Sequence, residues 1–249
     1  MSRTLKDQLV GLDPRIRYRG LNQTRIETFS DAVFALAITL VILSSTVPET
    51  FAELRTSMAD VIPFFLCVIL LVVIWTQHYK YFLKYGLQDQ KTIVYNTFLL
   101  FLVLVYVYPL KFLMKFLVTL FTSLVTGNFS YFMEAYGNNM QSGDMPFLMM
   151  VYGLGASLIF LTLAMLYRHA YKRREELELD DYEAFDAKAS VGTNLLMGAI
   201  PMLSFLIALI GPDRPITYNF SGFIYMLYPI IMPIYGSRVR KKMKKQFGE

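Results

Sequence analysis

The sequence predicts an all-α membrane protein with six transmembrane helices in one domain. Hydrophobic residues make up 55% of the 249 residues, and only 17% are charged, whereas soluble domains carry about 25% charge. The apolar residues also gather in uncharged runs that approach the roughly 20 helical residues needed to cross a bilayer. The apolar runs exclude a soluble enzyme and a disordered chain. A disulfide scaffold is excluded because the sequence has a single cysteine, Cys67, which lies inside an apolar run.

Six uncharged runs are predicted to span the membrane. They are Ala32–Pro48, Val61–Tyr79, Thr92–Leu110, Met145–Tyr167, Ala189–Pro212 and Pro215–Ser237. The first run is the shortest, and it extends toward Thr28 if Asp31 is tolerated within it. A seventh apolar run, 116–133, is rich in hydroxyl and small residues and follows the third run with almost no loop. We interpret it as the third helix continuing beyond the membrane, followed by a loop through Asp144.

The distribution of basic residues supports six spans with both termini in the cytoplasm. In this arrangement the segments 1–27, 80–91, 168–188 and 238–249 share one side and hold 20 of the 24 Lys and Arg residues. Basic segments are retained in the cytoplasm during insertion. We therefore predict a cytoplasmic segment 1–27, a transmembrane region 28–237 and a basic cytoplasmic tail 238–249. The tail is expected to touch anionic lipid headgroups rather than nucleic acid.

Motifs that carry enzyme chemistry are absent. The sequence has no Walker-type loop, no GxSxG elbow, no HExxH and no cysteine–histidine ligand set. Its two histidines are distant from each other, and His169 lies in a basic loop where we expect it to be solvated. The sequence therefore predicts neither an enzyme nor a metal or cofactor site, and it also lacks a TVGYG-type filter of backbone carbonyls.

Polar residues of the first three runs fall at similar membrane depth. Asp31 lies at the entry of the first run, and a carboxylate near lipid needs a partner. Trp75 and His78 share one face of the second run, and Asn96 lies one turn into the third. A buried cluster of these residues with Ser30 is geometrically allowed, because indole, imidazole and amide groups all bond carboxylates or hydroxyls. Two alternatives remain open: Asp31 caps its helix, and Trp75 with His78 belongs to an interfacial belt.

The first run also carries an apolar stripe. Leu36, Leu40 and Leu43 fall on one helical face with Thr39 beside them. Such a stripe usually faces lipid or packs in the core, and lining a pore is the alternative. In the fourth run, Gly153 and Ser157 are spaced for a close helix contact.

The segment Arg25-x-x-x-Phe29-Ser30-Asp31 resembles the RxxxFSD signature of the lysosomal potassium channel family, transmembrane protein 175, and its prokaryotic relatives. The residues that follow it are similar to the first helix of that family. Six spans resemble the prokaryotic form, which has one six-helix unit per chain. The remaining similarity lies in Trp75, His78 and Asn96.

The resemblance implies a homotetramer in the plasma (inner) membrane of a prokaryote, with the first helices lining a central pore, K⁺ as the permeant ion and no cofactor. In the family the narrowest ring is a branched apolar residue five positions after the signature aspartate, which here is Leu36. Leu40 and Leu43 would form further rings, and Thr39 would supply a hydroxyl that helps select potassium. The resemblance also implies that the signature residues belong to a structural polar network. Its members here would be Arg25, Phe29, Ser30, Asp31, Trp75, His78 and Asn96.

The implied function is a potassium-preferring, leak-like cation channel with a hydrophobic constriction and no carbonyl filter. A proton-coupled secondary transporter that uses Asp31 and His78 is the main alternative, and prolines inside the later runs are compatible with the broken helices of transporters. A structural or assembly factor, which would carry no current, is a further alternative.

Overall fold

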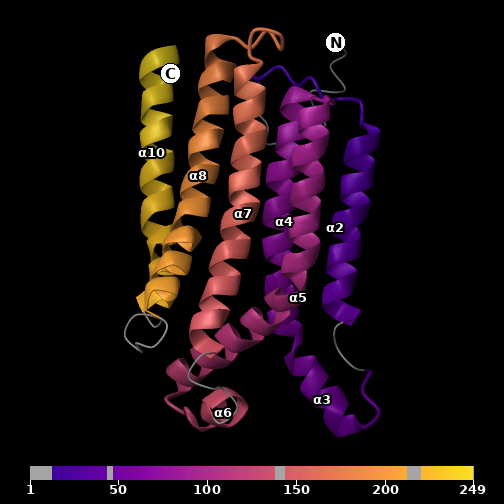
Figure 1. Cartoon of the computed structure of the whole chain (residues 1–249), viewed down its shortest axis with the longest axis vertical. Helices are drawn as coiled ribbons and strands as arrows, with labels where there is room; N and C mark the ends of the chain where they lie inside the picture. Colours follow the sequence, from indigo (N-terminus) through magenta and orange to yellow (C-terminus); the bar gives the residue numbers. More distant parts are fainter. Residues whose placement is uncertain (1–12, 44–46, 138–143, 212–219, 249) are drawn as a thin grey trace.

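The computed structural model describes residues 13–43, 47–137, 144–211 and 220–248. Within this part, six helices are long and apolar enough to cross a membrane, which confirms an all-helical chain with six membrane-capable helices. Figure 1 shows these helices standing side by side along the long axis, with short helical segments at one end. The helical elements are α2 (Arg25–Leu43), α3 (Phe51–Ala59), α4 (Val61–Tyr85), α5 (Gln90–Thr126), α6 (Ser130–Phe132), η1 (Met133–Gly137), α7 (Asp144–Lys172), α8 (Asp181–Ile210), η2 (Ile224–Leu227) and α10 (Tyr228–Phe247).

The first and last described segments meet at the same end of the helices. The Tyr182 hydroxyl, in the first turn of α8, donates a hydrogen bond to the Asp13 carboxylate. The Tyr182 ring also packs edge-on against Phe247, with 5.3 Å between the ring centroids. The chain therefore returns to its starting side, as an even number of spans requires, and α3 and α6 lie at the opposite end (Figure 1).

Helix α2 begins earlier than its apolar run predicts. The Thr24 hydroxyl accepts a hydrogen bond from the Glu27 backbone N–H at 3.3 Å, and the Glu27 carboxylate accepts one from the Thr24 backbone N–H at 3.1 Å. This reciprocal capping box starts the helix at Arg25. The alternative in which Asp31 caps the helix is therefore wrong, because Asp31 lies well inside it. Residues 44–46, within the predicted first span, lie outside the described residues.

Helix α5 runs without interruption from Gln90 to Thr126, so the third helix does continue into the 116–133 run as predicted. Its second half bends away from the first half (Figure 1). Pro109 lies inside the helix, and a proline there removes a backbone hydrogen bond and favours a kink. The helix ends at Gly127, whose φ of +67° is favourable for glycine. A short α6 and the π-helical η1 follow where a loop was predicted.

Two further helical segments were not predicted. Helix α3 lies between the first two spans, and the Thr50 hydroxyl caps it by accepting from the Glu53 backbone N–H at 3.2 Å. Helix α10 continues as far as Phe247, so most of the predicted tail is helical. Residues 212–219, which include the predicted start of the last span, lie outside the described residues.

Helices α7 and α8 pack closely through small residues. The Ser157 hydroxyl donates to the Gly198 carbonyl oxygen at 2.9 Å. A Cβ atom at Gly153 would lie only 2.8 Å from the Pro201 carbonyl oxygen. The predicted close helix contact at Gly153 and Ser157 is therefore confirmed.

The segment before α2 crosses the ends of α4 and α8. The Arg19 guanidinium pairs with Glu183 at 2.6 Å, and both side chains are largely buried. The Glu183 carboxylate also accepts a bond from the Arg17 backbone N–H at 2.6 Å. On the other side, the Gly20 backbone N–H donates to the Leu83 carbonyl oxygen at 3.1 Å. These contacts fix the chain just before it enters the first span.

The prediction that His169 is solvated is wrong. Its side chain is only 11% exposed, and its Nε2 lies 2.9 Å from the Asp89 carboxylate. Burial alone would raise the pKa of Asp89, but the hydrogen bonds from the Thr92 hydroxyl and His169, together with the charge of Arg173, lower the pKa below its usual value. This contact joins the end of α7 to the start of α5.

We predict that Gly153→Ala destabilises the protein by about 1–3 kcal/mol, because the added methyl group forces the backbones of α7 and α8 apart. Thermal unfolding of the detergent-purified protein measures the effect as a lowered midpoint. Gly222→Ala is the matched control, since a Cβ atom there meets nothing closer than 3.9 Å. Equal midpoints for the two variants would contradict close packing at Gly153.

Candidate functional site

Helix α2 has two distinct faces. One face packs against α4 and α5 and includes Val33, Phe34, Ala37 and Val41, all of which are buried. The opposite face carries Leu36, Leu40 and Leu43, here called the leucine stripe, whose exposed fractions are 50%, 38% and 74%. At 3.6 residues per turn these three leucines share one side of the helix. Figure 1 shows α2 at the outer edge of the helices.

A chain of buried hydrogen bonds holds the packed face of α2. The Asn96 amide nitrogen donates to the Ser30 hydroxyl oxygen at 2.9 Å, and the Asn96 amide oxygen lies 2.8 Å from His78 Nε2. Because an amide oxygen can only accept, His78 Nε2 donates in this contact. The Ser30 hydroxyl in turn donates to the Ile26 carbonyl oxygen at 2.7 Å. These bonds link α2, α5 and α4 with no more than 2% exposure at any of the three side chains.

Asp31 is held by a second, separate set of bonds. The Trp75 indole N–H donates to one carboxylate oxygen at 2.8 Å. The Gln23 amide nitrogen donates to the other oxygen at 3.2 Å. The structure therefore brings Asp31 and Trp75 together beside the Ser30 chain. The interfacial-belt alternative does not describe His78, which is 1% exposed and bonded to Asn96.

The signature segment is divided between the two faces of α2. Ser30 and Asp31 turn toward α4 and α5, whereas Arg25 and Phe29 are exposed on the side of the leucine stripe. The structure does not bring Arg25 and Phe29 into the hydrogen-bonded network. Thr39 is exposed beside the stripe, and its hydroxyl donates to the Leu36 carbonyl oxygen at 2.7 Å.

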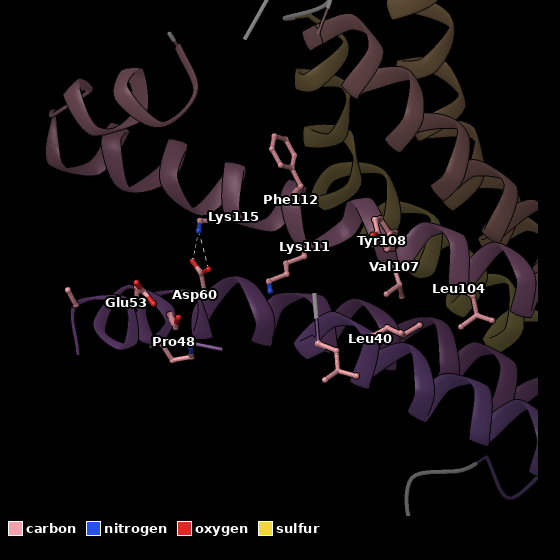
Figure 2. Close-up of a pocket in the computed structure, with 13 residues that line it drawn as sticks. Leu40, Pro48, Glu53, Asp60, Leu104, Val107, Tyr108, Lys111, Phe112 and Lys115 are labelled. Atoms are coloured by element: carbon pink, nitrogen blue, oxygen red, sulfur yellow. Dashed lines mark hydrogen bonds and ion pairs between the residues drawn. The ribbon is translucent and has the colours of Figure 1, made fainter. Parts of the chain in front are cut away.

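Two cavities flank α2. A cavity of about 270 Å³ lies near its start and is lined by Gln23, Glu27, Asp31 and His78 among others. A larger cavity of about 880 Å³ lies at its far end, where Leu40 and Leu43 form part of the wall. Figure 2 shows this cavity with Leu40 labelled. Among the residues that the structure describes, no cluster of His, Cys, Asp and Glu side chains could hold a metal ion.

Sequence reasoning missed two contributors to this region. Gln23 lies outside every apolar run, and nothing in its neighbourhood indicated that it reaches Asp31. The ion pair between Asp60 and Lys115, 3.0 Å apart in the larger cavity, joins the residue before α4 to a residue inside α5. No local pattern predicts such a pair.

The profile of the endosomal/lysosomal potassium channel TMEM175 family matches residues 25–109, which include α2, α4 and much of α5. A potassium channel from Marivirga tractuosa is 51% identical to this chain over 247 residues, or 98% of each protein. The chain belongs to the TMEM175 family of potassium channels. The resemblance inferred from the signature residues is thus confirmed.

Other comparisons agree with TMEM175 membership. The crystal structure of a threonine-to-alanine variant of the potassium channel MtTMEM175, in complex with a nanobody–MBP fusion protein, matches with a TM-score of 0.82 and 51% identity. That match covers 93% of this chain and all of the other. A potassium channel from Chamaesiphon minutus is 32% identical over 102 residues, which cover 38% of this chain and 50% of that protein.

These relatives decide between the classes of function left open by the sequence. The TMEM175 family and the matched proteins are ion channels and not enzymes. The chain is a multi-pass membrane protein, as its six membrane-capable helices indicate. The proton-coupled transporter is not favoured.

We predict that Asp31→Ala lowers the stability of the protein by about 1–3 kcal/mol, because it leaves the Trp75 indole N–H without its acceptor. Trp75→Phe removes the donor instead. The loss of unfolding free energy in the double variant should be smaller than the sum of the two single losses, by roughly 0.5–3 kcal/mol, because both substitutions remove the same bond. Unfolding in detergent micelles measures the free energy of all three variants.

Thr28→Ala serves as the control, since Thr28 is exposed and its hydroxyl donates to the Thr24 carbonyl oxygen of its own helix start, at 3.0 Å. Strictly additive losses for Asp31→Ala and Trp75→Phe would argue against an energetically coupled pair.

Proposed function

We propose that four copies of this chain surround a central pore lined by α2, and that this pore is a potassium-preferring, leak-like channel without a carbonyl filter or a bound cofactor. One observation carries the proposal. The leucine stripe points away from its own subunit, on a helix whose opposite face is fixed by buried hydrogen bonds. The experiment that tests it is ion flux through a variant in which the stripe is made polar.

The exposed apolar faces support assembly with other copies. Besides the leucine stripe, α5 exposes Phe98, Phe101, Val105 and Tyr108. Homo-oligomers close through rotational symmetry, which brings the same face of every subunit to the axis. In a fourfold assembly the α2 helices would place the stripe at the axis, and neighbouring subunits would cover the adjoining apolar surface. Membership of the TMEM175 family favours this arrangement over lipid on every exposed face.

A ring of leucines would gate the pore by excluding water. Apolar side chains offer no ligands to a bare cation, so a narrow ring blocks conduction and a wider one passes partly hydrated ions. We assign the narrowest ring to Leu36, with Leu40 and Leu43 forming further rings. Potassium sheds water more readily than sodium, which gives a modest preference. Thr39 would contribute through its hydroxyl oxygen, which keeps lone pairs for a cation while its O–H bonds the Leu36 carbonyl.

We propose that the end of the helices that contains residues 13–24 and the end of α10 is cytoplasmic, in the plasma (inner) membrane of a prokaryote. This end carries most of the basic residues. The whole chain then forms one channel domain, with segment 1–27 and tail 238–249 inside the cell and region 28–237 in the membrane.

The last turns of α10 have the features of an anionic-lipid contact. Tyr235, Val239, Met243 and Phe247 are spaced four residues apart and are partly buried. The basic side chains are exposed around the rest of the helix; they are Arg238, Arg240, Lys241, Lys242, Lys244 and Lys245. At the cytoplasmic surface such a run attracts anionic headgroups, at about 1 kcal/mol per basic residue. Nucleic acid is not a proposed partner.

We predict that Leu36→Asn raises K⁺ flux, or reduces the preference for K⁺ over Na⁺, because an amide wets the constriction. Reconstituted liposomes with K⁺ or Na⁺ gradients measure both quantities. Ile42→Asn is the matched control, since Ile42 is 54% exposed on the same helix but lies outside the stripe. Unchanged flux and selectivity for Leu36→Asn would count against the pore assignment.

A second prediction concerns assembly. Leu43→Cys in a Cys67→Ala background should form oxidative cross-links between subunits, because the stripes of neighbouring copies approach the axis. Native Cys67 is fully buried and is removed only as a precaution. Ile234→Cys, on the peripheral helix α10, should remain uncross-linked. Denaturing gels of the oxidised membranes distinguish the two, and cross-linking at Ile234→Cys alone would oppose this arrangement.

A further inference from the structure

The larger cavity beside α2 lies at the end of the molecule opposite the basic surface. Its volume is about 880 Å³, and its walls come from the end of α2, from α3 and from the middle of α5. Leu40 and Leu43, two members of the leucine stripe, form part of these walls. Figure 2 shows Leu40, Val107 and Leu104 along one part of the cavity, with the charged side chains gathered along the other.

The charged groups in the cavity are balanced. Two carboxylates, those of Glu53 and Asp60, and two ammonium groups, those of Lys111 and Lys115, belong to its lining. The Glu53 carboxylate accepts a bond from the Glu49 backbone N–H at 2.8 Å, which holds it at the start of α3. Each subunit therefore brings an equal number of formal positive and negative charges to this space.

The Asp60–Lys115 ion pair connects two sides of the cavity (Figure 2). Its atoms are 3.0 Å apart, and the two side chains are 26% and 43% exposed, so the pair remains in contact with water. Asp60 occupies the position before α4 where an aspartate commonly caps a helix, yet its carboxylate makes no capping bond and reaches Lys115 instead. The pair joins the start of α4 to α5 beside the place where the stripe ends.

We propose that this cavity is the outer entry chamber of the pore, and that the Asp60–Lys115 pair sets the electrostatic potential that a cation meets before it reaches the leucine stripe. The proposal rests on the proposed function, because it takes the stripe as the ion path. Leucine side chains do not attract cations. The rate at which cations reach the leucine stripe therefore depends on the cation concentration in the chamber next to it. A cleft lined by charges of one sign concentrates counter-ions, so the Asp60–Lys115 pair holds the chamber near neutrality, and loss of either partner would shift the cation concentration.

Neutralising one partner changes the chamber charge in a known direction. Lys115→Met leaves the Asp60 carboxylate uncompensated, which adds one negative charge per subunit and attracts K⁺. Asp60→Asn leaves the Lys115 ammonium, which repels K⁺. The double variant Asp60→Asn with Lys115→Met restores the balance without the ion pair, so it separates the effect of charge from the effect of the contact.

The test measures K⁺ current in planar bilayers with K⁺ supplied on the chamber side. At about 10 mM salt, where the Debye length is about 30 Å, Lys115→Met should raise the current about twofold or more and Asp60→Asn should lower it by a similar factor. The double variant should return close to the unmodified protein. At about 1 M salt, where the Debye length is about 3 Å, the K⁺ currents of the unmodified protein, the two single variants and the double variant should become equal.

Glu53→Gln provides an independent variant that leaves the ion pair intact. Its amide oxygen can still accept the bond from the Glu49 backbone N–H, but one negative charge per subunit is lost. The current at low salt should therefore fall, in the same direction as with Asp60→Asn. Unfolding midpoints measured in parallel identify any variant whose current falls because the protein is damaged.

Two results would overturn the proposal. Currents that fall in both single variants and do not recover at high salt would make the pair a structural contact only. Currents unchanged in every charge variant, while Leu36→Asn still alters flux, would place the chamber off the ion path and leave the pore assignment standing. If Leu36→Asn is without effect as well, the proposed function itself fails.

Discussion

The hydrogen bonds that fix the rotation of α2 are the constraint on which the rest of the structure depends. Asn96 connects Ser30 of α2 with His78 of α4 in a buried setting. A polar group inside an apolar region is costly without a partner, so losing the Asn96 side chain would leave His78 without this acceptor and Ser30 with only its bond to the Ile26 carbonyl oxygen. Successive residues of a helix are about 100° apart around its axis. Turning α2 by one residue position would therefore move Ser30 away from Asn96 and break the chain of bonds. The outward direction of the leucine stripe follows from this constraint.

Contacts outside the apolar region hold the same helix from its start. The residues that precede α2 are tied to α8 through the Arg19–Glu183 pair and to the end of α4 through Gly20. Asp31 adds a further tie to Trp75 nearly two turns into the helix. Helix α2 is therefore anchored at the basic end of the molecule. Its other end reaches the large cavity, where Leu40 and Leu43 meet open space.

The helices beyond α5 play a different part. Small residues let α7 and α8 approach closely, as the Ser157–Gly198 bond shows. This pair, with α10 at its side, supplies the packed body to which α4 and α5 attach. The family profile covers α2, α4 and much of α5 but none of this later part. The Ser30–Asn96–His78 bonds that fix the rotation of α2 thus lie within the residues that the family profile matches.

Hydropathy predicted where the spans lie, but helix ends followed other rules. The start of α2 depends on the Thr24–Glu27 capping box, and α3 begins at a similar pair, Thr50 and Glu53. Both pairs have the sequence Thr-x-x-Glu, so the starts of these two helices could have been predicted from local sequence. The extension of α10 through its basic residues was not, because that segment is too polar to register as a span.

The sequence by itself determined the six apolar segments, the side on which the basic residues gather, and the shared depth of Ser30, Asp31, Trp75, His78 and Asn96. These are properties of composition and spacing along the chain. Only the tertiary structure decided which partner each polar group takes and which face of α2 stays open. Asp31 and Trp75 are 44 positions apart, and Arg19 and Glu183 are 164 apart. Pairings over such separations depend on how whole helices pack and rotate against one another, and no local pattern records that.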